Sequence, residues 1–498
     1  MTKLEQLKEK LGLSRKFEYA ANVLYFDYET LCPTGAREDE GEVLGFLSNE
    51  VFKLLTSDEV KGLIIDLHND IDSIEDPLDK VLINRLYEGY EKTKNMTPEF
   101  QMEMTVTHNK AYMKWLEAKE KSDFSIYKDA LADNLKIDKK AIELRDKILP
   151  NFYDNYLNDT EKGVLTADLD PFFDELKVGL LELIQKIKNS KHVIRRDFLS
   201  RNVPIHKQEE FSRYLLELNG YDFKRGALTT TEHPFTMPVA QNDARVTTHY
   251  YEDMFLSNIF SIIHEGGHAI FMQNERKEDF EHYINDEVTN GMHESVSRFY
   301  ENVIGRSKEY IHLIYPKFKE IFAEEFPDVS EQELYEGVNI VEPSLIRTEA
   351  DEVTYGLHVL IRYEMEKLIC NGLIAMEDVP AKWNALYKEY LGIDVPSDKE
   401  GVLQDVHWAH NFGYFPSYQI GNCYNAMYVL RMRKEFDLDK AIETGDFTTI
   451  NNWMKENVFK KANELMPKEW IKDITGEALT PKPFLDYLNK KYSKIYQF

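Results

Sequence analysis

The longest helix-favouring stretch of the chain places the strongest constraint on its fold. No glycine occurs from Tyr90 to Lys162, and Pro98 and Pro150 bracket a run of good helix formers. Residues 1–150 are therefore expected to be helical almost throughout. Such helices bury their apolar stripes against one another, so the chain is predicted to be mostly α.

One segment departs from this helical pattern. Pro234 and Pro238 exclude a helix interior, and Asn242-Asp243 is a turn signal. Ala244 to Tyr250 is rich in β-branched and aromatic residues, which predicts a strand. The edge of such a strand could bind an extended peptide by main-chain pairing.

Helical spacing returns in the second half of the chain, where Pro343 is expected to open a long helix with its apolar face at Leu357 to Leu368. No repeat, low-complexity tract or flexible linker separates autonomous units within the 498 residues. We therefore expect a single large helical domain, residues 1–498, with a small β-sheet.

A candidate metal site lies just after the predicted strand. His264, Glu265 and His268 spell H-E-x-x-H within an apolar helical segment. Two histidines four residues apart lie on one face of a helix and can bind one cation, while Glu265 can take a proton from the bound water. Gly266 and Gly267 each cost about 1 kcal/mol in a helix relative to alanine. We interpret the pair as clearance for another backbone or a substrate.

A catalytic zinc site needs a third protein ligand and an open position for water. Glu287, Glu294 and Glu301 are spaced seven residues apart and would share a helical face. Spacing alone does not choose among them, and all three could simply solvate that face. The H-E-x-x-H pattern alone also leaves open an ordinary core helix without metal.

Composition excludes several classes of partner. The formal net charge is −27, from 61 Lys+Arg against 88 Asp+Glu, so nucleic acid is an unfavourable partner. No run approaches 18 apolar residues, and the N-terminal residues lack the apolar core of a secretory signal, so no membrane association is expected. Three widely spaced cysteines, Cys32, Cys370 and Cys423, exclude a cysteine-cage zinc site and fit a cytoplasmic location.

Six short motifs follow one another along the chain: His233-Pro234-Phe235, Asp243-x-Arg245-x-Thr247-Thr248, His264-Glu265-x-x-His268, His293-Glu294-Ser295, Ile346-Arg347-x-x-Ala350-Asp351 and Gly401-x-x-Gln404-Asp405-x-His407-Trp408. In this order they resemble the carboxypeptidase Taq family of metallocarboxypeptidases, across essentially the whole chain. The stretches at Asp27 to Ala36 and at Tyr414-Phe415-Pro416 also fit. Ala244 departs slightly, because the family usually carries a larger aliphatic residue there.

The resemblance implies a ligand set and a mechanism. It selects Glu294 as the third ligand, so that two histidines and one glutamate bind Zn²⁺, for which Co²⁺ can substitute. Glu265 acts as general base and then passes the proton to the leaving amine. The oxyanion needs further donors, and by similarity to related helical metallopeptidases these are His407 and Tyr418, with Tyr414 a close second.

An exopeptidase must also hold the free C-terminal carboxylate of its substrate, and the negative net charge makes a locally placed cation necessary. Arg347 matches the family, because a guanidinium binds a carboxylate with two hydrogen bonds. The alternative for Arg347 is a surface ion pair with Asp351 four residues later; Asp351 could also orient the arginine. Arg245 is the second candidate. The resemblance places further motif residues along the substrate groove: Asp243, Thr247, His233 and Gln404.

The function expected is removal of C-terminal residues from peptides with broad preference. The resemblance implies a deep active-site groove within residues 232–420, covered by a lid-like part formed by residues 1–150. It also implies a homodimer. Two alternatives remain: an endopeptidase or oligopeptidase on the same scaffold, and a structural or regulatory metal-binding protein. Glu265 argues against the latter, since closed structural zinc sites need no general base.

Overall fold

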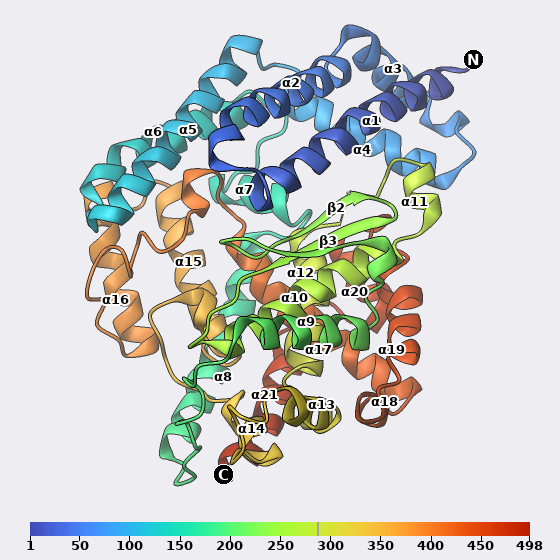
Figure 1. Cartoon of the computed structure of the whole chain (residues 1–498). Helices are drawn as coiled ribbons and strands as arrows, with labels where there is room; N and C mark the ends of the chain where they lie inside the picture. Colours follow the sequence, from blue (N-terminus) through green and yellow to red (C-terminus); the bar gives the residue numbers. More distant parts are fainter. Residues whose placement is uncertain (286–287) are drawn as a thin grey trace.

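The structure, a computed structural model, describes residues 1–285 and 288–498 (Figure 1). The N-terminal part consists of six helices: α1 (Lys3–Thr30), α2 (Arg37–Leu55), α3 (Asp58–Asn69), α4 (Pro77–Thr93), α5 (Pro98–Lys121) and α6 (Ser125–Glu143). The side chains of Thr2, Ser57 and Thr97 cap the first turns of α1, α3 and α5. The prediction that residues 1–150 are helical almost throughout is confirmed.

A small sheet follows three further helices, α7 (Phe152–Thr160), α8 (Thr166–Asn189) and α9 (Ile205–Asn219). Its strands are β1 (Leu228–Thr230), β2 (Thr236–Ala240) and β3 (Asp243–Thr248), in the order β1-β3-β2. The central strand β3 pairs parallel with β1 and antiparallel with β2. Pro238 lies in the edge strand β2, where a missing N–H does not interrupt the sheet.

The helix with the H-E-x-x-H motif begins shortly after β3. This part of the chain contains α10 (Phe255–Asn274), α11 (Lys277–Glu281) and α12 (Asn290–Arg298), and α12 continues as a π-helical turn at Phe299–Ile304. Glycines allow α12 to lie close to its neighbours. A Cβ on Gly267 of α10 would lie 2.9 Å from the Ser297 Cα of α12. The interpretation of Gly267 as clearance for another backbone is confirmed; Gly266 leaves room for the side chain of Leu216 on α9.

The remaining helices complete the core: α13 (Lys308–Ile321), α14 (Glu331–Gly337), α15 (Tyr355–Cys370), α16 (Val379–Leu391), α17 (Phe415–Glu435), α18 (Leu438–Thr444), α19 (Phe447–Met454), α20 (Pro467–Thr475) and α21 (Lys482–Tyr496). Most of α17 is buried. It packs against the other side of α12, where a Cβ on Gly421 would lie 3.0 Å from the Ser295 nitrogen. Thus α12 lies between α10 and α17.

The prediction that Pro343 opens a long helix is wrong. Residues 343–354 contain only two short turns, at Arg347–Glu349 and at residues 352–354, and α15 begins at Tyr355. The Asp351 carboxylate accepts hydrogen bonds from the backbone of Glu342, Val353 and Thr354. Side-chain partners thus satisfy backbone donors that would otherwise bond within a helix.

The mostly α architecture with a small sheet beside the H-E-x-x-H helix is as predicted (Figure 1). A second, smaller hydrophobic cluster joins α1, α3 and α4, with Leu7, Val60 and Ile83 at its centre. The lid-like role of residues 1–150 within one domain remains a prediction. Among the described residues, no helix is both long enough and apolar enough to cross a bilayer.

Candidate metal centre and substrate groove

Three side chains from α10 and α12 converge on one point. The Nε2 atoms of His264 and His268 lie 3.6 Å and 3.5 Å from the Glu294 Oε2. A tetrahedral zinc ion with bonds of about 2.0–2.1 Å separates its ligands by about 3.3–3.4 Å. The spacing and the donor set of two nitrogens and one oxygen therefore fit a zinc ion with little rearrangement.

Both histidines are oriented through their other ring nitrogen. The Nδ1 of His264 lies 2.9 Å from the Glu301 carboxylate, and the Nδ1 of His268 lies 2.6 Å from the Nδ1 of His293. Arg298 donates to both Glu294 and Glu301. These contacts turn each Nε2 toward the point of convergence, as is usual for histidine ligands of metals. Glu301 therefore lies behind His264, while Glu287 lies outside the described residues.

The charges around this point favour a cation. Burial alone would lower the pKa of His264, but the carboxylates of Glu294 and Glu301 raise that pKa to about 9. Burial opposes the ionisation of Glu294, yet the imidazoles of His264 and His268 hold the pKa of Glu294 well below its usual range. The carboxylates that stabilise a proton on His264 would equally stabilise a divalent cation.

Glu301→Gln is expected to weaken zinc binding by roughly 10- to 100-fold, the usual effect of losing a group that orients a ligand. The amide keeps the size of the side chain but removes the charge that holds the Nδ1–H of His264. Competition with a chromophoric chelator measures the change. Unchanged zinc affinity in a folded variant would show that the contact does not orient the ligand.

The candidate general base lies on the same helical turn. The Thr236 hydroxyl lies 2.7 Å from the Glu265 Oε2 and 2.9 Å from the Glu265 backbone oxygen. Thr236 begins the edge strand β2, so the sheet contacts the base directly. Glu265 is 9% exposed, which leaves it accessible from the cavity described next.

A cavity of about 670 Å³ is lined by two of the three candidate metal ligands, His264 and Glu294, and by the candidate base Glu265. Tyr418 of α17 also lines it, and the Nε2 of His407 lies 3.3 Å from the Tyr418 hydroxyl. Burial lowers the pKa of His407 to about 4, so its ring is neutral at neutral pH. The ring of Tyr414 is 5.3 Å from that of Tyr418. Of the three predicted oxyanion donors, Tyr418 is thus the one that faces the cavity, with His407 and Tyr414 against it.

Arg347 lines the same cavity although it is only 5% exposed. Its Nη2 lies 2.9 Å from Asp405 and its Nη1 lies 3.0 Å from the Tyr355 hydroxyl. Arg362 donates to the other oxygen of Asp405 at 2.6 Å. Two arginines share one carboxylate, which leaves one net positive charge. Asp405 takes the Nε–H and one Nη2–H, and Tyr355 takes one Nη1–H, so two of the five N–H groups of Arg347 have no partner in this network.

Gln404 and Asp351, the other predicted residues near Arg347, accept hydrogen bonds from the backbone. Gln404 accepts hydrogen bonds from the Arg347 backbone and from Arg362. Asp351 caps the turn before α15, as described above, and Asp405 rather than Asp351 orients the arginine. The alternative of an i, i+4 ion pair between Arg347 and Asp351 is wrong, because the segment is not helical.

The Asp243–Thr248 motif forms β3 and its contact with α1. Arg245 forms a bidentate ion pair with Asp243. The Cζ atom of its guanidinium lies 5.0 Å from the centre of the Phe26 ring. Thr247 is fully buried, and its hydroxyl exchanges hydrogen bonds with the Phe235 backbone. His233 lines the cavity from the segment before β2.

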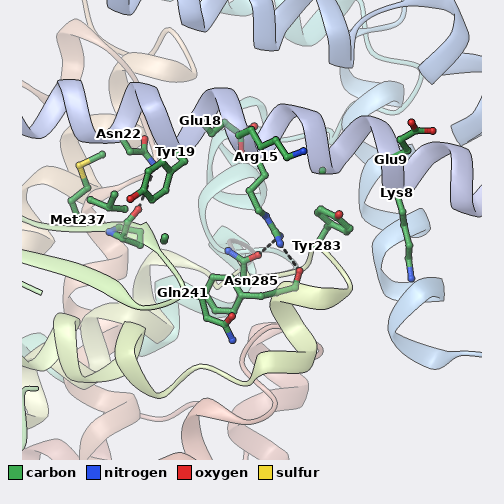
Figure 2. A pocket seen from close by; sticks show the side chains of 16 residues that line it. Lys8, Glu9, Arg15, Glu18, Tyr19, Asn22, Met237, Gln241, Tyr283 and Asn285 are labelled. Atoms are coloured by element: carbon green, nitrogen blue, oxygen red, sulfur yellow. Dashed lines mark hydrogen bonds between the residues drawn. The ribbon is translucent and has the colours of Figure 1, made fainter. Parts of the chain in front are cut away.

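A larger cavity, of about 1040 Å³, lies between α1 and β2 (Figure 2). None of the predicted site residues is among the described residues that line it. Arg15 donates to the Phe280 backbone oxygen and the Asn285 side chain, and its guanidinium lies 4.2 Å from the centre of the Tyr283 ring. These contacts attach α1 to the end of α11 and to the segment that follows it.

Sequence reasoning missed several residues that build the site. Asp405 and His293 lie inside the quoted motifs, but nothing local shows that Asp405 holds two arginines or that His293 contacts His268. Thr236 directly follows the His233-Pro234-Phe235 motif. Arg298 follows Glu294 by four residues, a spacing that predicts an ion pair on a helix.

Comparison with known proteins agrees with this geometry. The family model described as carboxypeptidase Taq (M32) metallopeptidase matches residues 6–492. Carboxypeptidase 1 of Bacillus subtilis is 38% identical over 494 residues, covering 98% of each chain. Thermostable carboxypeptidase 1 of Thermus thermophilus is 33% identical, covering 100% of each. The crystal structure of the M32 carboxypeptidase from Deinococcus radiodurans R1 superposes with a TM-score of 0.95 at 31% identity over 100% of both chains. The chain therefore belongs to the carboxypeptidase Taq (M32) family of metallopeptidases.

Proposed function

We propose that this metallocarboxypeptidase is a zinc enzyme that removes residues one at a time from the free C-terminus of peptides, with broad preference. One observation carries the proposal. The cavity that contains His264, Glu265 and Glu294 is also lined by Arg347, whose cluster with Asp405 and Arg362 carries a net positive charge. An endopeptidase needs no such cation, because the chain it cleaves continues past the active site.

In this proposal His264, His268 and Glu294 hold the zinc ion, which when bound acidifies a water and polarises a carbonyl. Glu265 takes the proton from the attacking water and gives it to the departing amine. Its hydrogen bond from Thr236 keeps the carboxylate oxygen in place for that transfer. The Tyr418 hydroxyl donates to the carbonyl oxygen as that oxygen becomes negative.

The two ends of the substrate are positioned by different elements. The free N–H groups of Arg347 bind the C-terminal carboxylate with two hydrogen bonds. At the far end, Arg245 and Asp243 with Phe26 of α1 close the groove, which admits short tails and excludes folded chains. His233 lines the groove wall. Thr247 and Gln404 support the groove through their hydrogen bonds to the backbone of Phe235 and Arg347. We propose that Asp351 acts only through the backbone it caps.

The decisive experiment compares a free peptide with its C-terminally amidated twin. The zinc-loaded protein is incubated with each, and products are followed by mass spectrometry. Stepwise shortening of the free peptide alone supports the proposal. Internal cleavage of both peptides would instead assign an oligopeptidase. Cleavage of neither, with zinc confirmed bound, would assign a non-catalytic role.

The metal and the cellular setting are part of the same proposal. Zinc fits the donor set, and Co²⁺ is expected to restore activity after chelation because nitrogen and carboxylate ligands accept both ions. One zinc ion per chain is expected by elemental analysis. The three cysteines are free and buried, which supports a reducing, cytoplasmic setting.

We also propose that a second copy of the chain is a partner. None of the residues of α2 is fully buried, and Phe46 on this helix is 60% exposed. On α5, Met102 and Met113 are 70% and 62% exposed. A contiguous patch of exposed apolar side chains is typical of interfaces, and we propose that these side chains form such a patch. Phe46→Glu combined with Met113→Glu is expected to shift sedimentation from dimer to monomer; a wild-type monomer would refute the proposal.

A further inference from the structure

A buried carboxylate lies at the start of α12, the helix that carries Glu294. Glu161 directly follows α7 and is fully buried. Among the described residues, no lysine, arginine or histidine forms an ion pair with it. Its carboxylate instead accepts hydrogen bonds from the Gly291 backbone and, at 2.8 Å, from the Thr289 hydroxyl. Burial raises the pKa of Glu161 to about 7, and these two hydrogen bonds, together with the nearby Ser417 hydroxyl, which lacks the geometry of a regular hydrogen bond, oppose that rise.

These partners belong to the starts of two helices. Thr289 is the N-terminal cap residue of α12 and Gly291 is the second residue of that helix, while Ser417 lies in the first turn of α17. Neither helix has a hydrogen bond from its own cap side chain. The first turn of a helix has unpaired N–H groups and a partial positive charge, so it favours an anion. In its ionised form, Glu161 supplies that anion from a third element.

The two helices carry groups that must meet at the reacting bond. Glu294 lies one turn into α12, and Tyr418 lies in the first turn of α17. Beside Glu161, the Thr160 hydroxyl donates to the Gly413 backbone oxygen at 2.8 Å, just before α17. The end of α7 is thus bonded to the approach to α17 and to the start of α12. Because α12 and α17 pack closely at Gly421, a shift of either helix along the other would move Glu294 relative to Tyr418.

We propose that Glu161 is a positioning residue that fixes the starts of α12 and α17, and thereby places Glu294 for metal binding and Tyr418 for the reaction. The inference rests on the proposed function. Gly291 serves the same arrangement, because a Cβ at this position would lie 2.7 Å from the Glu161 Oε1 and would displace the carboxylate.

The test is Glu161→Gln in the full-length protein, with three readouts. Zinc affinity, measured by chelator competition, is expected to fall roughly 10- to 100-fold, as for other groups that orient a ligand. The visible absorption spectrum of the Co²⁺-loaded protein is expected to shift, because it reports ligand geometry. With saturating zinc, kcat on a free peptide is expected to fall while KM stays within about twofold, since Arg347 is not disturbed.

Asp154→Asn is the matched control. Asp154 is another buried carboxylate of α7, and it accepts a hydrogen bond from the Thr166 backbone at the start of α8, at 2.7 Å. Its loss is expected to lower the melting temperature without changing zinc affinity or the Co²⁺ spectrum. If Glu161→Gln does not fold, Gly291→Ala takes its place in the test. This substitution displaces the Glu161 carboxylate while keeping its charge, and the same shift of the Co²⁺ spectrum is expected.

Wild-type zinc affinity and an unchanged Co²⁺ spectrum in folded Glu161→Gln or, failing that, folded Gly291→Ala would overturn the inference. Equal effects of Asp154→Asn would also overturn it, because they would show a general loss of stability. A wild-type protein that binds no zinc, or that does not shorten the free peptide, would instead refute the proposed function. The two failures are therefore distinguishable.

Discussion

Glu265→Gln is expected to lower kcat on a free peptide by about 10³-fold while the protein still binds zinc with nearly its original affinity. General acid–base catalysis contributes about 10²- to 10⁴-fold. Among the described carboxylates beside the candidate metal ligands, Glu265 is the one that forms no ion pair with an arginine. Glu294 and Glu301 are both paired with Arg298. Glutamine has the same size and can still bond to Thr236.

Steady-state kinetics and elemental analysis on one preparation test this result. Loss of zinc together with activity would not distinguish a base from a ligand, so the zinc content must be measured with the rate. Thr236→Val is the matched control, because it removes the hydroxyl but leaves the carboxylate free to act. It is expected to lower kcat far less than Glu265→Gln. Retention of more than a tenth of the wild-type kcat by Glu265→Gln would refute the role of general base.

The part of the site that lies within one helix could be predicted from the sequence. The spacing of His264 and His268 places both rings on one face of the helix, independently of the tertiary structure. The strand predicted at Ala244 to Tyr250 corresponds to β3, because β-branched residues next to a turn signal act locally. The mostly α architecture follows from the same kind of local pattern.

The choice of Glu294 could not be made from spacing. Glu294 and Glu301 lie in one helical stretch, and only the packing of α12 against α10 places one carboxylate at the Nε2 side of His264 and the other at its Nδ1 side. That packing depends on Gly267 and on the widening of the helix into a π-turn at Phe299–Ile304. Only the resemblance to a family indicated Glu294 rather than Glu301 as the third ligand.

Contacts between distant segments were the least predictable. The helix expected from Pro343 is absent because side chains bind the backbone of this segment, both from within it, as Asp351 does, and from far along the chain, as Gln404 does at Arg347. Asp405 and Glu161 show the same limit. Each is an ordinary acidic residue in the sequence, and its importance comes from partners between 43 and 130 residues away.

The second large effect is expected for Arg347→Lys. Lysine keeps the positive charge but has no planar fork, so it cannot bind a carboxylate with two parallel hydrogen bonds while it also bonds to Asp405. Truncating a buried, hydrogen-bonded charge pair costs about 3 kcal/mol, which is roughly a 10²-fold loss of kcat/KM for peptides with a free C-terminus. We expect most of this loss in KM, because the carboxylate is bound in both the ground state and the transition state.

The amidated peptide separates this role from a structural one. An amide does not carry the charge that Arg347 would bind, so Arg347→Lys is expected to leave the already slow cleavage of the amidated peptide almost unchanged. Asp405→Asn is the matched variant: it frees the arginine instead of replacing it, and Arg362 loses its ion pair at the same time. It is expected to reduce discrimination between the two peptides less than Arg347→Lys does. An equal loss on both peptides in Arg347→Lys, with zinc content and circular dichroism intact, would show that Arg347 supports the fold of the groove and that the carboxylate is bound elsewhere, with Arg245 the next cation to test.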